Sequence, residues 1–73
     1  DLQPVNNINS YLMRSGFVSN IQVASETNMK IILRYDLQAV DEPGGTSNFR
    51  GTATMIKSSD GWKINDIVNR FVP

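Results

Sequence analysis

A strict alternation of apolar and polar side chains between Met29 and Val40 constrains the fold of this chain more than any other feature. The odd positions are apolar and most even positions are polar or charged, the apolar set being Met29, Ile31, Leu33, Tyr35, Leu37 and Ala39. Successive side chains of a β-strand point to opposite faces of the sheet. The pattern therefore predicts a long strand with one buried and one mostly solvated face, as in an antiparallel sheet.

Turn sequences on both sides of this strand predict hairpins. Before it, Glu26-Thr27-Asn28 separates it from a shorter alternation that places Phe17, Ile21 and Val23 on one face. After it, residues 41–45 (Asp-Glu-Pro-Gly-Gly) combine the fixed φ of proline with the freedom of two glycines. Both connections are short, so we expect each pair of strands to run antiparallel.

Two more strands are predicted beyond residue 45. The first has one face made of Phe49, Gly51, Ala53 and Met55. Ser59-Asp60-Gly61 then predicts a tight hairpin, because Asp-Gly is a favoured pair in primed turns. Trp62 and Ile64 begin the last strand.

The end of the chain fits two structures. Ile64, Ile67, Val68 and Phe71 have the i, i+3, i+4, i+7 spacing of a helix. A strand with a bulge near Asp66 gives a similar spacing. We favour the strand, because Trp62 and Ile64 continue the alternation of the hairpin.

The first segment has the pattern of a short helix. Pro4 suits a first helical turn, and Val5, Ile8 and Leu12 form one apolar stripe. Gly16 is expected to end the helix as a left-handed cap. A helix of about three turns is not stable alone, so the stripe must dock on the sheet.

These elements predict an α+β fold in which one N-terminal helix packs on a four-stranded antiparallel meander, in the order α-β-β-β-β. With 73 residues there is room for one core, so residues 1–73 are expected to form a single domain. The chain begins at Asp1 rather than at Met, and we expect it to be a segment of a longer protein.

Charge and composition argue against several function classes. Seven basic residues balance seven acidic ones, which does not favour a nucleic-acid binder or a polybasic membrane-surface module. No unbroken apolar run exceeds three residues, as in Ile31 to Leu33, so no membrane insertion is expected. The absence of Cys and His excludes disulfides and thiolate metal sites, and no cofactor is expected.

Catalysis is not expected either, because His and Cys are the commonest general base and the best nucleophile. Asp36 and Asp66 are the candidate carboxylate pair, and their favoured interpretation is surface charge that balances Arg34 and Lys63. Asp41 and Glu42 could touch a divalent cation, but two carboxylates are a weak basis for a site. A solvated turn is the favoured interpretation there.

The solvated face of the sheet is the leading candidate for a binding surface. Several apolar residues interrupt its polar pattern, and several basic residues accompany them. A clustered patch of this kind indicates docking on another chain, or self-association. The expected partner-binding residues are Lys30, Ile32, Arg34, Val40, Arg50 and Ile56. The alternative is a small-ligand pocket between helix and sheet, lined by Tyr11, Tyr35, Trp62 and Phe71.

Residues 51–57 and 59–67 resemble the closing hairpin of cystatin-like domains. The resemblance is greatest to the nuclear-transport-factor-like branch with its small bacterial extracytoplasmic members. In that branch the penultimate strand runs into an Asp-Gly turn and then Trp-Lys-Ile, here Trp62-Lys63-Ile64. Members of the branch have two or three helices before the sheet, whereas this chain has the pattern for one.

A weaker resemblance covers residues 5–33, where a helix ending in Ser-Gly-Phe is followed by two strands. This segment is similar to the opening of BON-like or ring-building domains of secretion systems. Both resemblances imply a non-catalytic domain in an envelope, secretion or conjugation assembly. The implied location is extracytoplasmic, at the periplasm or cell surface, with the cytoplasm as the alternative.

Overall fold

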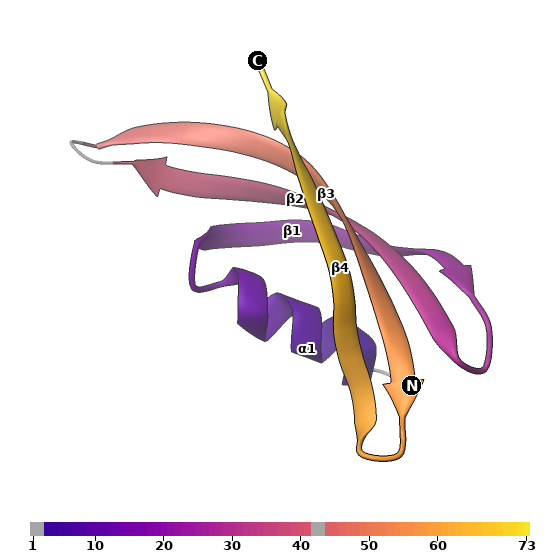
Figure 1. Cartoon of the computed structure of the whole chain (residues 1–73). Coiled ribbons are helices and arrows are strands. Elements are labelled where there is room, and N and C mark those ends of the chain that lie inside the picture. Colours follow the sequence, from indigo (N-terminus) through magenta and orange to yellow (C-terminus); the bar gives the residue numbers. More distant parts are fainter. Residues whose placement is uncertain (1–2, 42–43) are drawn as a thin grey trace.

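The computed structural model describes residues 3–41 and 44–73, except for the side chain of Asp41, and shows one helix against one sheet (Figure 1). The elements are α1 (Gln3–Leu12), β1 (Gly16–Glu26), β2 (Lys30–Asp41), β3 (Gly45–Ser58) and β4 (Gly61–Val72). The strands are antiparallel and lie in the order β1-β2-β3-β4. The predicted α-β-β-β-β meander is confirmed.

The alternation in β2 has the predicted effect. Its odd residues Ile31, Leu33, Tyr35 and Leu37 are buried, and its even residues are partly or fully exposed. Met29 is an exception, because it lies in the β1–β2 turn and its side chain is 60% exposed. The turn is held by the Thr27 hydroxyl, which accepts hydrogen bonds from the backbone N–H groups of Met29 and Lys30.

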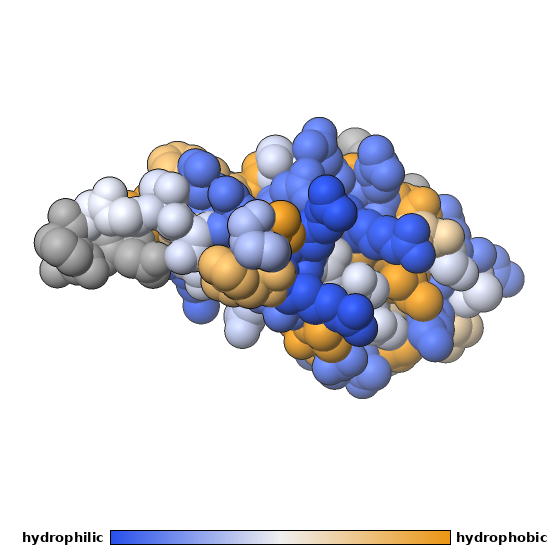
Figure 2. Space-filling model, turned by 90° about the horizontal axis from the view of Figure 1, so that it is seen from above, coloured by the Kyte–Doolittle hydropathy of each residue, from blue (hydrophilic) through white to orange (hydrophobic). Residues whose placement is uncertain are grey.

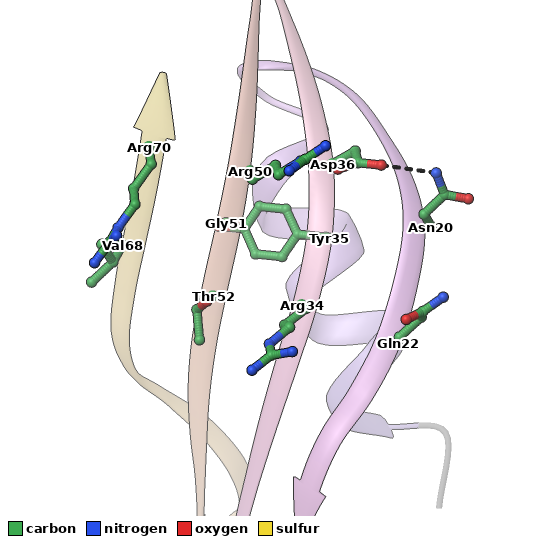
Figure 3. Close-up of a pocket in the computed structure, with 10 residues that line it drawn as sticks. All are labelled: Asn20, Gln22, Arg34, Tyr35, Asp36, Arg50, Gly51, Thr52, Val68 and Arg70. Atoms are coloured by element: carbon green, nitrogen blue, oxygen red, sulfur yellow. Dashed lines mark hydrogen bonds between the residues drawn. The ribbon is translucent and has the colours of Figure 1, made fainter. Parts of the chain in front are cut away.

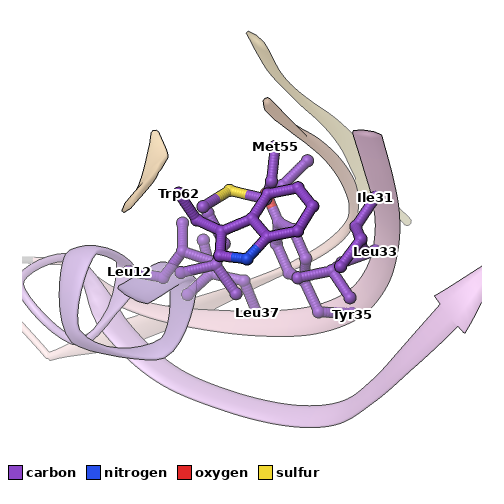
Figure 4. Packing of buried hydrophobic residues seen from close by; sticks show 9 residues of the cluster. Leu12, Ile31, Leu33, Tyr35, Leu37, Met55 and Trp62 are labelled. Carbon is purple, nitrogen blue, oxygen red and sulfur yellow. The ribbon is translucent and has the colours of Figure 1, made fainter. Parts of the chain in front are cut away.

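The core lies between α1 and the middle of the sheet. Ile8 and Leu12 of the predicted stripe are buried, Val5 is partly buried against the core, and Pro4 is the third buried residue of the helix. Ile8 and Leu12 belong to one buried cluster with the inner side chains of β2 and β3, including Met55, and with the indole of Trp62 (Figure 4). The Asn7 Nδ2 group donates a hydrogen bond to the Trp62 carbonyl oxygen at 3.2 Å, which ties α1 to the start of β4.

Gly16 does not cap the helix, and that prediction is wrong. Its φ is not in the left-handed region, and it forms the first residue of β1, opposite Ala39. A Cβ at this position would overlap the backbone carbonyl of Gln38. The glycine is needed for close approach between β1 and β2 rather than for a helix end.

The β3–β4 hairpin differs in detail from expectation. The β3–β4 loop consists of Ser59 and Asp60, and Gly61 follows in the positive-φ region at 112°. The predicted tight hairpin is confirmed, but Asp60 does not have the positive φ of a primed turn, so the predicted turn type is wrong. In hairpins whose turn is not of the primed type, a glycine with positive φ directly after the turn, here Gly61, lets the two strands pair with their normal twist. The β2–β3 hairpin forms as predicted between Asp41 and Gly45, although residues 42–43 lie outside the described part.

Bulges decide which side chains of the outer strands face the core. In β1 the register shifts between Ser19 and Gln22, and Asn20 has a positive φ of 54°. Val18 and Ile21 therefore pack against the core on either side of the bulge. The prediction that Phe17 shares a face with Ile21 is wrong, since an extra residue reverses the alternation.

In β4 the strand interpretation is confirmed. The strand continues to Val72, and its register shifts between Ile64 and Asp66, which leaves Asn65 as the extra residue. Trp62 and Ile64 face the core before the bulge, and Ile67 does so after it.

Tyr35 ties together the three strands that follow β1. Its ring lies across Gly51, the residue opposite it on β3, and its hydroxyl donates a hydrogen bond to Asn69 Oδ1 on β4. A Cβ on Gly51 would overlap this ring. An aromatic ring that covers a glycine on the neighbouring strand protects the exposed backbone there and fixes the strand register.

This arrangement predicts that Gly51→Ala destabilises the fold. The added methyl group displaces the buried Tyr35 ring, and overpacking of this kind lowers the free energy of unfolding by about 1–3 kcal/mol. Gly45→Ala is the matched control, because Gly45 is also in β3 and nothing lies within 4 Å of its added Cβ. Urea unfolding monitored by Trp62 fluorescence measures both variants. Equal stability of the two would contradict the role assigned to Gly51.

Candidate functional site

The sheet has an outer face, defined here as the face opposite α1. It carries the even residues of β2 and β3, together with Asp66, Val68, Arg70 and Val72 of β4. Figure 2 views the molecule from the side away from α1 and shows strongly hydrophilic side chains across the middle, with apolar ones beside them. In the part of the chain that the structure describes, α1 is the sole helix, and it covers the other face.

Three arginines on neighbouring strands form the centre of the outer face (Figure 3). We call Arg34, Arg50 and Arg70 the arginine cluster. Arg50 on β3 lies directly opposite Arg70 on β4, and Arg34 on β2 is diagonal to Arg50. Side chains in such positions have Cβ atoms roughly 5 Å and 7–8 Å apart, well within the reach of a guanidinium group.

None of the three arginines of the arginine cluster forms an ion pair with another described residue. Among the described residues the one ion pair is between Lys63 Nζ and Asp60 Oδ2, at 3.9 Å in the β3–β4 turn. Like charges directly opposite each other, as Arg50 and Arg70 are, destabilise a sheet. The two guanidinium groups therefore repel each other at the centre of the outer face, and a bound anion would reduce this repulsion.

The nearest carboxylate is held by a different partner. Asp36 lies opposite Arg50, but its Oδ2 accepts a hydrogen bond of 2.8 Å from Asn20 Nδ2. Asn20 can do this because it occupies the left-handed conformation at the bulge of β1, which asparagine tolerates well. With three arginines and one carboxylate, this region has a net charge of about +2.

An open hollow of about 660 Å³ lies over the arginine cluster. Its lining residues are mostly of polar or charged types and come from all four strands: Asn20, Gln22, Arg34, Tyr35, Asp36, Arg50, Gly51, Thr52, Val68 and Arg70. A second hollow of about 420 Å³ shares Asp36 and Arg50 with it and extends toward Phe17, whose side chain is 69% exposed. The two form one groove with a basic end and an apolar end.

The predicted partner-binding residues all lie on the outer face, but they do not form one compact patch. Lys30 and Ile56 are directly opposite, and Ile32 is diagonal to Ile56 near the same end of the sheet. Val40 is ten residues from Lys30 along β2, a separation of about 33 Å. Arg34 and Arg50 lie between these ends, as described above.

The residues of the alternative ligand pocket do not line a common cavity. Trp62 and Tyr35 are buried in the core, whereas the side chains of Tyr11 and Phe71 are 50% and 63% exposed. Tyr11 and Trp62 share a shallow hollow between α1 and β4. Phe71 instead packs edge-on against Phe49, with the ring centroids 5.9 Å apart.

The candidate catalytic carboxylates are far from each other. Asp36 lies opposite Arg50, and Arg50 lies opposite Arg70. Asp66 is four residues before Arg70 on β4. Four residues span about 13 Å along a strand, and two strand spacings add about 10 Å across the sheet. Glu42 and the side chain of Asp41 are outside the described residues, and the described ones contain no group of three or more metal-binding side chains.

The sequence alternation puts Asn20 and Gln22 on the face opposite Ile21 and Val23, but it did not mark them, Val68 or Arg70 as candidate site residues. Asn20 lies in the bulge of β1, and the other three follow a bulge, so their positions depend on an extra residue that the alternation alone does not give. The one available signal was the change of parity between Ile64 and Ile67, which was consistent with a bulge near Asp66.

Comparison of the chain with family models, curated proteins and solved structures gave no significant match. Of the described residues, none belongs to a helix with the length and hydrophobicity needed to cross a bilayer. The assignment of function therefore depends on the geometry of the outer face.

The Tyr35 hydroxyl provides a test of the structure beneath the groove. Burial raises the pKa of Tyr35 above its ordinary value of 10.0, so the folded chain holds this proton more tightly than the unfolded chain. Its contribution to stability is complete below about pH 10 and falls as the pH rises beyond that value. We expect Tyr35→Phe to lose less stability than the wild type between about pH 9 and about pH 11.

The matched control is Tyr11→Phe, which removes an exposed hydroxyl from α1. Its unfolding free energy should follow the wild-type decline at alkaline pH. Urea titrations at each pH measure the three proteins, and identical pH profiles for Tyr35→Phe and the wild type would refute the assignment.

Proposed function

We propose that this chain is a non-catalytic protein-interaction domain whose outer sheet face docks on an acidic segment of another protein. One observation carries the proposal: Arg34, Arg50 and Arg70 gather over an open groove without forming ion pairs among the described residues. Arginine is well suited to this role because its planar fork binds carboxylates through two parallel hydrogen bonds.

The shape of the groove favours a polypeptide over a small molecule. Small-molecule sites are concave and mostly apolar, and they enclose most of the ligand. This groove is open and crosses several strands, so it would enclose only part of a small ligand. An extended acidic segment can lay carboxylates on the arginine cluster and an apolar side chain on Phe17 at the other end.

The balance of charge favours a protein over a nucleic acid. The whole chain has a formal net charge of zero, so the positive region is local. Nucleic-acid affinity depends on neutralising many phosphates along a path. Three guanidinium groups match a few carboxylates, each of which contributes about 1.5–3 kcal/mol when its hydrogen bonds are charge-assisted.

We place this domain in an extracytoplasmic assembly of a bacterial envelope, of the secretion or conjugation type. This part of the proposal rests on the resemblance of residues 51–57 and 59–67 to the closing hairpin of nuclear-transport-factor-like domains. A cysteine-free chain is compatible with an oxidising compartment, where no thiol would be exposed to oxidation.

A synthetic peptide that alternates Glu and Val serves as a probe of the groove. In an NMR titration we expect salt-dependent shifts at the backbone amides of Arg34, Arg50 and Thr52. Arg50→Gln should weaken binding about tenfold, since it removes one charge-assisted contact.

Lys57→Gln is the matched control, because Lys57 is an exposed cation that lies opposite Trp62, on the face of the sheet that α1 covers. It should leave the affinity unchanged. Equal weakening by both substitutions, or shifts centred on α1, would show that the peptide responds to charge in general and would refute the proposal.

A further inference from the structure

The two edges of the sheet differ in how well they are protected. The strand order leaves β1 and β4 at the edges. Bulges interrupt β1 twice, once at Asn20 and Ile21 and once at Ala24. Bulged edges twist away from a partner strand, which is a common way to prevent edge-to-edge association.

The second half of β4 lacks this protection. Its first half lies beside α1, where Asn7 binds the Trp62 carbonyl and Tyr11 lies near Ile64. Its one bulge, at Asn65, precedes residues 66–72, which run without a register shift to the end of the strand. Figure 1 shows this half of β4 rising clear of α1. An edge strand directs half of its backbone N–H and C=O groups away from the sheet.

We propose that two copies of this chain associate through residues 66–70 of β4, paired antiparallel about a two-fold axis at Val68. In this register Asp66 of each copy lies opposite Arg70 of the other, and the two Val68 side chains are adjacent. The two four-stranded sheets become one continuous sheet of about eight strands, with both helices on the same side.

The charged side chains favour this register over the registers with a two-fold axis at a neighbouring residue. A two-fold axis at Asp66 places two carboxylates opposite each other, and one at Arg70 does the same with two guanidinium groups. An axis at Ile67 or Asn69 places Val68 opposite one of the charged residues. The axis at Val68 is the one within residues 66–70 that pairs opposite charges, and it does so twice by symmetry.

The side chains at the pairing site are exposed in the single chain. Asp66 and Arg70 are exposed, and the Val68 side chain is 46% exposed on the outer face. Pairing would cover Val68 and reduce the repulsion between Arg70 and Arg50, because Asp66 of the second copy lies beside Arg70. Arg34 and Arg50 of each copy would remain open in the groove.

The paired segment is short, so the association is weak and depends on concentration. Sedimentation equilibrium over a concentration series measures it for the wild type, Asp66→Arg and Arg70→Asp. We expect the wild type to dimerise and each single variant to dimerise at least about tenfold more weakly, because each places like charges opposite each other.

Mixing the two single variants gives a sharper test. An Asp66→Arg chain facing an Arg70→Asp chain has opposite charges at both positions, so the mixture should form a heterodimer of nearly wild-type affinity. The double variant Asp66→Arg/Arg70→Asp should dimerise with itself for the same reason. Asp60→Arg, in the β3–β4 turn, is the matched control and should leave dimerisation unchanged.

Each variant is first shown to be folded by its NMR dispersion. A wild type that stays monomeric at the highest concentration would overturn the inference, as would dimerisation that is unaffected by either single change or not restored in the mixture. The result is separable from the proposed function, because monomeric Asp66→Arg retains Arg34 and Arg50 and should still bind the acidic peptide.

Discussion

The helix α1 is much shorter than the strands that it packs against, and most features of this protein follow from that difference in length. The ten residues of α1 extend about 15 Å, whereas strands of 11 to 14 residues extend about 36 to 46 Å. The helix therefore covers the centre of the inner face and the start of β4. Phe71, the outer face and the far half of the β4 edge remain exposed, and the candidate binding surfaces lie on the last two of these.

Bulges distribute side chains between the two faces. Without the extra residue near Asn20, Val18 and Ile21 could not both reach the core. Without Asn65, the residues after Ile64 would change faces, and Arg70 would leave the arginine cluster. The same irregularities thus complete the core and assemble the basic groove, which links the stability of the fold to its candidate site.

The sequence was sufficient to predict the element order, the strand β2 and the helix stripe, because each depends on a local period. It placed Lys30, Ile32 and Arg34 on the solvated face for the same reason. It could not place Arg70, and it put Phe17 on the wrong face, since a bulge is defined by the partner strand as well as by its own residues. Gly16 was misinterpreted because a glycine shortly after a helix can either cap the helix or permit close approach of two strands, and the local sequence is the same in both cases.

The Tyr35 ring has a further consequence for how the molecule opens. The Tyr35 side chain belongs to β2, its ring packs on Gly51 of β3, and its hydroxyl donates a hydrogen bond to Asn69 of β4. None of these three strands can therefore separate without disturbing the other two. β1 is joined to β2 by an exposed hydrogen bond from Asn20 to Asp36 and by a ladder that two bulges interrupt. Amide protons of β2, β3 and β4 should therefore exchange as one cooperative unit, while those of β1 exchange through smaller, more frequent openings. The surface proposed for binding rests mainly on the slowly exchanging unit.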